Sequence, residues 1–110
     1  MQYDLRTELR KIAASHPQDA LERALNTQHT LNSISLEERT LAFATMWHQY
    51  WEFEFRPESN IDAYTLRGLL SNYGLDEWSD YLIRHAASGA TVRFENAESL
   101  AMARLAINEV

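Results

Sequence analysis

Apolar side chains recur at helical spacing along most of the chain. Leucine and isoleucine at positions i, i+4 and i+7 predict a first helix over about residues 3–14. Pro17 suits the first position of a second helix, which runs to about residue 25, because the N–H that proline lacks would have no helical partner there. The polar stretch 26–32 is typical of a loop.

A third helix has the clearest start in the sequence. Ser35 and Glu38 match the capping-box pattern, in which each side chain satisfies a backbone N–H of the other residue. From Leu36 to Tyr50 the apolar residues surround the helix axis and do not form one stripe. A helix that is apolar all round is usually buried at the centre of a domain. The pattern therefore predicts a hub for the fold.

The segment that follows allows two interpretations. Residues 51–55 alternate between aromatic and acidic side chains, which is the period of a half-buried strand. Continuing the helix to about residue 55 would instead place Glu52 four residues before Arg56, at the spacing of an ion pair, and we favour this interpretation. Pro57 ends either element, because proline disfavours helical backbone at the residue before it.

Three further helices complete the expected fold. The fourth covers about residues 61–73, with Asn60 as its N-cap and Gly74 as the left-handed residue beyond its end. Apolar spacing places a fifth helix at about 75–87 and a sixth at about 97–108.

Residues 91–94 are rich in strand formers and would form either an extended connector or a small strand paired with residues 51–55. The expected fold is therefore all-α. It is a single compact domain, residues 1–110, of about five or six short helices around a central hydrophobic helix at about 36–55. The pairing of 51–55 with 91–94 is the one β-element that this fold would allow, as the alternative to the connector.

Composition narrows the range of functions. The chain has 110 residues and no cysteine, which removes disulfides, thiol nucleophiles and cysteine-type metal sites. Its formal net charge of −6 disfavours direct nucleic-acid binding, which requires a basic patch. No apolar run is long enough to span a membrane, and the first residues do not match a signal peptide. We therefore expect a cytoplasmic protein that contacts neither membrane nor nucleic acid.

Motifs for catalysis, cofactors and metals are lacking. There is no nucleophile elbow, no phosphate-binding glycine loop and no dinucleotide fingerprint. No two histidines stand three or four residues apart. His48 and Glu52 have metal-ligand spacing, but two residues with this spacing more often form a simple hydrogen bond. We expect no enzymatic activity, no cofactor and no metal.

Two segments combine aromatic and acidic side chains, and interfaces are enriched in Trp, Tyr, Phe and Arg. The candidate partner-binding residues are Trp51, Glu52, Glu54, Arg56 and Glu58 in the first segment, and Asp76, Glu77 and Asp80 in the second. Most of the sixteen acids fall in first turns of predicted helices or four residues before an arginine (Asp19–Arg23, Glu52–Arg56, Asp80–Arg84). Mimicry of nucleic acid is therefore one option and not a requirement.

The leading hypothesis is a small acidic protein that binds the basic surface of another protein. Inhibitors or adaptors of the antitoxin, immunity or anti-defence type have this character, and their acidic groups speed the encounter with the partner. Two alternatives stay open. One is a ligand-binding or enzymatic pocket near His48 and Glu52. The other is a structural homodimer formed through the third and sixth helices.

Overall fold

The computed structural model describes residues 4–57, 61–86 and 89–108. It is mostly helical and contains a small antiparallel sheet. The elements in chain order are α1 (Leu5–Ser15), α2 (Ala20–Ser33), α3 (Leu36–Gln49), the 3-10 turn η1 (Trp51–Phe53), β1 (Glu54–Phe55), α4 (Ala63–Asn72), β2 (Tyr81–Ala86), β3 (Gly89–Phe94) and α5 (Ala97–Asn108).

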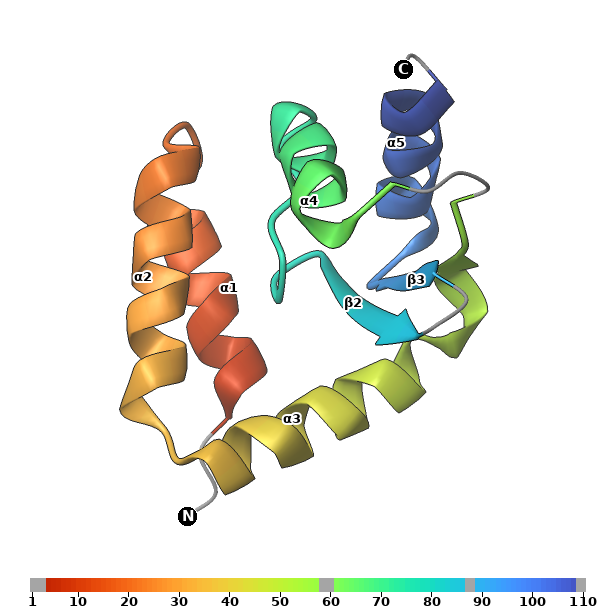
Figure 1. The fold of residues 1–110 in the computed structure, drawn as a ribbon. Coiled ribbons are helices and arrows are strands. Elements are labelled where there is room, and N and C mark those ends of the chain that lie inside the picture. Colours follow the sequence, from red (N-terminus) through yellow and green to blue (C-terminus); the bar gives the residue numbers. More distant parts are fainter. Residues whose placement is uncertain (1–3, 58–60, 87–88, 109–110) are drawn as a thin grey trace.

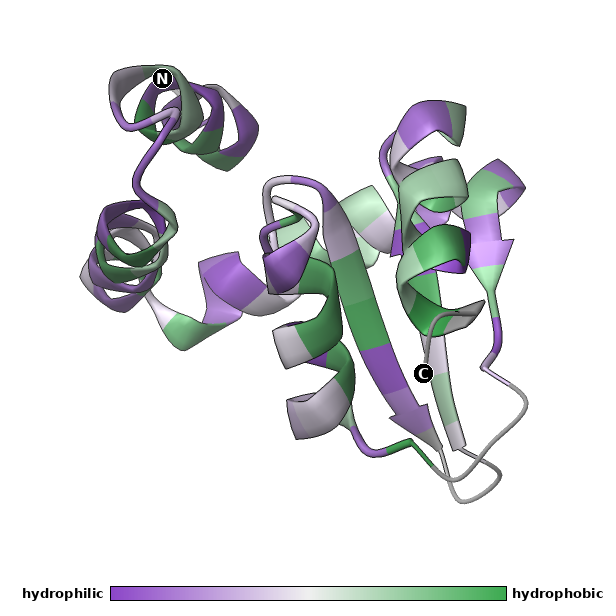
Figure 2. Ribbon diagram, turned by 90° about the horizontal axis from the view of Figure 1, so that it is seen from above, coloured by the Kyte–Doolittle hydropathy of each residue, from purple (hydrophilic) through white to green (hydrophobic). Residues whose placement is uncertain are grey.

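Two parts of the molecule lie side by side. The hairpin consists of α1 and α2, and the sheet part consists of the three strands with α4 and α5. Helix α3 runs beneath both and joins them (Figure 1). Seen from above, the hairpin stands to one side of the sheet part (Figure 2).

Helix α3 is a bridge and not the buried hub that the sequence predicted. Met46 and Trp47 are buried, but Leu36 is 73% exposed and Leu41 68% exposed. The C-terminal half of α3 packs against the sheet, where Trp47 and Met46 meet Leu82 of β2. The N-terminal half has only the hairpin beside it, so its outward leucines stay in solvent. A bundle around a central helix is therefore not what the chain forms.

The sheet has the strand order β1–β3–β2, and both pairs are antiparallel. Every second side chain along β2 and β3 points to one face of the sheet and joins the core formed with α4 and α5. These side chains are Tyr81, Ile83, Val92 and Phe94. Of the two alternatives for residues 91–94, the strand is confirmed: 92–93 pair with 54–55, but within a three-stranded sheet. Segment 51–55 thus combines a 3-10 turn with a short strand, so the favoured helix through residue 55 is wrong.

The fifth predicted helix, 75–87, is wrong. Residues 81–86 form β2, which pairs with β3 along its whole length from Tyr81↔Phe94 to Ala86↔Gly89. Leucine, tryptophan and alanine in this stretch have helical spacing, but the long-range pairing decides the outcome. It places Ile83 in the core beside Val92, and Leu82 on the opposite face beside α3.

Helix α2 is longer than predicted, because it continues through the polar stretch to Ser33. Within that stretch Thr27 and Leu31 are buried, Asn26 and Thr30 are half-buried, and the other polar residues are exposed. Asp19, and not Pro17, precedes the helix and caps it by accepting a hydrogen bond from the backbone N–H of Glu22.

The predicted helix ends are confirmed in part. The Ser35 hydroxyl accepts from the backbone N–H of Glu38 at 3.1 Å, but its own O–H donates to the Glu38 carboxylate, so only half of the capping box forms. Asn60 lies outside the described residues, and Asp62 caps α4. Gly74, with φ of 77°, ends α4 as predicted. Helix α5 matches the predicted bounds.

Candidate partner-binding surface

Asp76 forms a largely buried ion pair and is not open to a partner. Its Oδ2 lies 2.5 Å from Nε of Arg23, and the two side chains are only 13% and 10% exposed. Arg23 also donates to the backbone carbonyls of His16 and Pro17, at 2.8 and 3.0 Å. One guanidinium thus joins α2, the loop before it and the loop before β2. Arg23 pairs with Asp76 in place of the predicted Asp19.

Asp80 folds the same loop back on itself. Its carboxylate accepts from the backbone N–H of Asp76 at 2.7 Å, and its own N–H donates to the Asp76 carbonyl at 2.8 Å. Its carbonyl accepts from the N–H of Glu95, which extends the ladder between β2 and β3. Burial raises the pKa of the Asp80 carboxyl above its ordinary value, and the neighbouring Asp76 charge adds to this.

Trp78 sits at the tip of this loop in a strained conformation. Its φ is 75°, a left-handed value that costs a non-glycine residue about 1–3 kcal/mol. Its backbone N–H donates to the Tyr81 carbonyl at 2.7 Å. Its ring packs edge-on against the Phe43 ring, with 5.7 Å between the two ring centres. The indole also packs against Leu31 and its neighbours in the hairpin core. Trp78 therefore contacts the hairpin and α3 from within the sheet part.

We call residues Asp76–Asp80 the clasp, because they bind the hairpin to the sheet part. Glu77 completes it with an ion pair to Arg67 of α4 at 2.8 Å. The three acids that the sequence placed in the second binding segment thus make bonds within the chain. The predicted Asp80–Arg84 pair does not form either, since Arg84 lies over the Trp47 ring at 5.9 Å.

Glu54 of the first segment is also engaged within the chain. Its Oε1 accepts from Nε of Arg93 at 3.0 Å, and Arg56 lies 3.5 Å from its other oxygen. Arg93 lies 4.5 Å from the centre of the Trp47 ring and donates to the Trp47 carbonyl, so Glu54 helps to hold α3 on the sheet. Arg56 pairs with Glu54 and not with the predicted Glu52.

Trp51 and Glu52 remain open. The Trp51 side chain is 63% exposed, and Glu52 is exposed with no cation within ion-pair distance in the part of the chain that the structure describes. The preceding turn of α3 adds His48, which is exposed as well. Arg56 is exposed on the other side of β1. Glu58 lies outside the described residues.

A second polar junction was not predicted from the sequence. Glu95, after β3, accepts from Arg6 at 2.6 Å and from Arg10 at 3.0 Å, both on α1. Burial opposes the ionisation of Glu95, but these hydrogen bonds outweigh it and hold its pKa below the ordinary value. The residues stand more than 80 positions apart, and no local pattern connects them.

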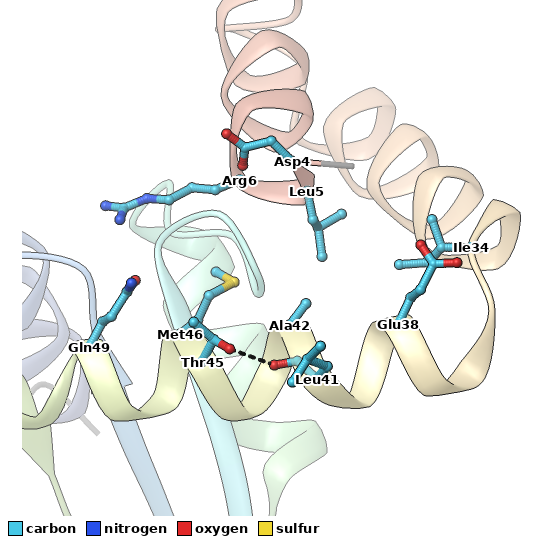
Figure 3. A pocket seen from close by; sticks show the side chains of 10 residues that line it. All are labelled: Asp4, Leu5, Arg6, Ile34, Glu38, Leu41, Ala42, Thr45, Met46 and Gln49. Carbon is cyan, nitrogen blue, oxygen red and sulfur yellow. Dashed lines mark hydrogen bonds between the residues drawn. The ribbon is translucent and has the colours of Figure 1, made fainter. Parts of the chain in front are cut away.

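Two cavities lie at junctions between helices. A groove of about 540 Å³ lies between the start of α1 and α3, and Figure 3 shows its lining. A smaller one of about 230 Å³ lies between α2 and α4, beside the clasp. His48 and Glu52 line neither of these two cavities, so neither cavity is the pocket proposed near them.

Among the described residues, no three histidine or acidic side chains come together in a group that could hold a metal ion. Within the same residues, no helix is both long and apolar enough to cross a bilayer. Comparison with protein-family models, curated proteins and solved structures finds no match to this chain.

Proposed function

We propose that this chain is a small acidic cytoplasmic protein that acts by occupying a basic surface of another protein, as an inhibitor or adaptor of the antitoxin, immunity or anti-defence type. The absence of cysteine fits a reducing compartment. The net charge of −6 favours encounter with a basic partner.

The observation that carries the proposal is the exposure of Trp51. A tryptophan that is 63% exposed leaves a large apolar surface in water, and tryptophan is enriched among the residues that dominate binding energy. Glu52 next to it is exposed and pairs with no cation among the described residues, so an arginine or lysine of the partner could pair with it. The binding surface we propose is therefore Trp51 and Glu52, with Arg56 at its edge.

The experiment is a quantitative capture of proteins from the lysate of the native host, with a salt step for elution. Wild-type bait is compared with Trp51→Ala and with Tyr64→Ala, a matched control because Tyr64 is an 86% exposed aromatic on α4. We expect one stoichiometric partner on wild type and on Tyr64→Ala, released by salt, and at least about tenfold less on Trp51→Ala. Equal recovery by all three baits, or no partner at all, would contradict the proposal.

A further inference from the structure

The smaller cavity, of about 230 Å³, lies where the hairpin meets the sheet part. One face of α2 forms a wall of it, with Ala24, Thr27, Gln28 and Leu31. The other lining residues belong to α4, to the clasp and to the chain on either side of the clasp (Figure 1). We call this space the clasp cavity. A molecule inside it would contact both parts of the protein.

The clasp cavity has a buried, mostly apolar part and a polar opening. The buried part includes aliphatic and aromatic side chains, of which three are at most 4% exposed and the fourth is half-buried. These are Leu31, Leu75, Tyr81 and Trp78. The lining residues that reach solvent are mainly polar, and they include Gln28, Arg67 and Ser71. A largely apolar space with a few polar groups is typical of small-molecule sites.

Thr27 brings a buried hydroxyl to the clasp cavity. The residue is 6% exposed and lines the cavity, and its Oγ1 has no hydrogen-bond partner among the described residues. The hydroxyls of Thr40 and Thr45 on α3 instead donate to the carbonyl four residues earlier. A buried hydroxyl without a partner is costly. Because threonine in a helix has two favoured side-chain rotamers, this hydroxyl can turn toward a polar group placed in the cavity.

The charged side chains that line the clasp cavity are already paired. Arg67 binds Glu77 at 2.8 Å, and Asp76 binds Arg23. A charged ligand would therefore meet no unpaired opposite charge among the described lining residues, and it would lose hydration on entry. The ligand that fits this lining is uncharged.

The volume of the clasp cavity suits a single ring. An apolar cavity of about 150 Å³ holds a benzene molecule. A space of about 230 Å³ therefore accommodates a benzene ring that carries a small substituent. Trp78 and Tyr81 offer aromatic surface against which such a ring can pack.

We propose that the clasp cavity binds a small uncharged aromatic molecule of the phenol class, whose polar group forms a hydrogen bond with the Thr27 hydroxyl. A phenolic O–H can both donate to and accept from this hydroxyl. The proposal is independent of the proposed function, because neither Trp51 nor Glu52 lines the clasp cavity.

An NMR titration of the full chain with phenol and with toluene tests the proposal. The two probes share a ring and differ in one group, a hydroxyl or a methyl. We expect wild type to bind phenol with a Kd on the order of 1 mM, with large chemical-shift changes at Leu31 and Leu75. Thr27→Val removes the hydroxyl and keeps the branched shape. It should reduce the preference for phenol over toluene at least about tenfold.

Thr30→Val is the matched control for this titration. It makes the same change on the same helix, at a residue that does not line the clasp cavity. We expect it to leave the preference for phenol unchanged. Absence of saturable phenol binding by wild type, or an equal change of preference in both variants, would overturn the proposal.

The thermal stability of the free protein supplies a second test, which needs no ligand. Thr27→Val should raise the Tm by about 4 °C, because a methyl group replaces a buried hydroxyl that lacks a partner. A role of Thr27 in the fold alone, with its hydroxyl bonded inside the protein, would lower the Tm instead. A Tm that stays equal or falls would therefore overturn the proposal.

Discussion

Segments 51–56 and 76–80 have similar compositions and different roles. Both join tryptophan to carboxylates, and the sequence alone placed both in a binding surface. In the second segment Trp78 packs against Phe43, and the carboxylate of Asp76 binds Arg23. In the first segment Trp51 stays in solvent. The difference depends on which distant residues the fold brings near, and not on the segments themselves.

This comparison explains how the hairpin is attached. The sheet part holds together through its apolar core between the strands, α4 and α5. The hairpin meets the sheet part through the Arg23–Asp76 pair, the Arg6–Glu95 pair and the Trp78 ring. Removing either residue of such an ion pair should lower the free energy of unfolding, because it leaves the other charge buried without a partner.

The largest effect is expected from Asp76→Ala. It leaves the Arg23 charge buried without its carboxylate, which should lower the free energy of unfolding by about 3 kcal/mol. Glu52→Ala, in the open segment, should change it by less than about 0.5 kcal/mol. Urea unfolding of both variants measures the contrast. Equal losses would show that the two segments do not differ in the way described.

Substitution of Trp78 and of Trp51 should also lower the free energy of unfolding by different amounts, with a smaller difference than that between Asp76 and Glu52. Trp78→Ala removes a half-buried ring and should cost about 2 kcal/mol, whereas Trp51→Ala should cost less than about 0.5 kcal/mol. Trp78→Gly should be no worse than Trp78→Ala, because glycine adopts a φ of 75° without strain. Thermal unfolding of the three variants tests this order. If Trp78→Gly is clearly less stable than Trp78→Ala, the left-handed backbone at position 78 is not strained.

The smallest expected effects are on the pH dependence of stability. Asp80 and Glu95 should contribute to this dependence with opposite signs. The raised pKa of Asp80 adds stability in acid that is lost as pH rises through that pKa, so Asp80→Asn should help more at pH 7 than at pH 3. The lowered pKa of Glu95 adds stability at neutral pH that is lost as pH falls through it, so Glu95→Gln should harm more at pH 7 than at pH 3. Urea unfolding at both pH values checks the signs. A shift of the same sign in both variants would contradict the assignment.

Local signals predicted much of the helical structure. The caps and apolar spacing around α1, α3, α4 and α5 are properties of neighbouring residues. Helices α1, α4 and α5 formed close to their expected bounds, and α3 began where expected but ended at Gln49. Strand β2 could not be found in this way, because Leu82 and its neighbours also fit a helix and only β3 decides between the two. The exposure of the N-terminal half of α3 could not be predicted locally either, because it depends on how much of that half the α1–α2 hairpin covers.

The candidate site was predictable only in its residue types. Sequence spacing offered Asp19 and Asp80 as arginine partners, but the pairs that form connect α2 to the clasp and α1 to the end of β3. A carboxylate's role follows from its nearest cation, and that cation is set by tertiary structure. Trp51 and Glu52 are exposed, and their part in binding stays a prediction.

The most direct test of the clasp is a double-mutant cycle between Arg23 and Asp76. It uses Arg23→Met, Asp76→Ala and the double variant, with the free energy of unfolding as the readout. We predict a coupling energy of about 2 kcal/mol, because the pair is buried and the double variant removes both charges. A coupling below about 0.5 kcal/mol, the value of an ordinary surface pair, would contradict the conclusion that the Arg23–Asp76 pair attaches the hairpin to the sheet part.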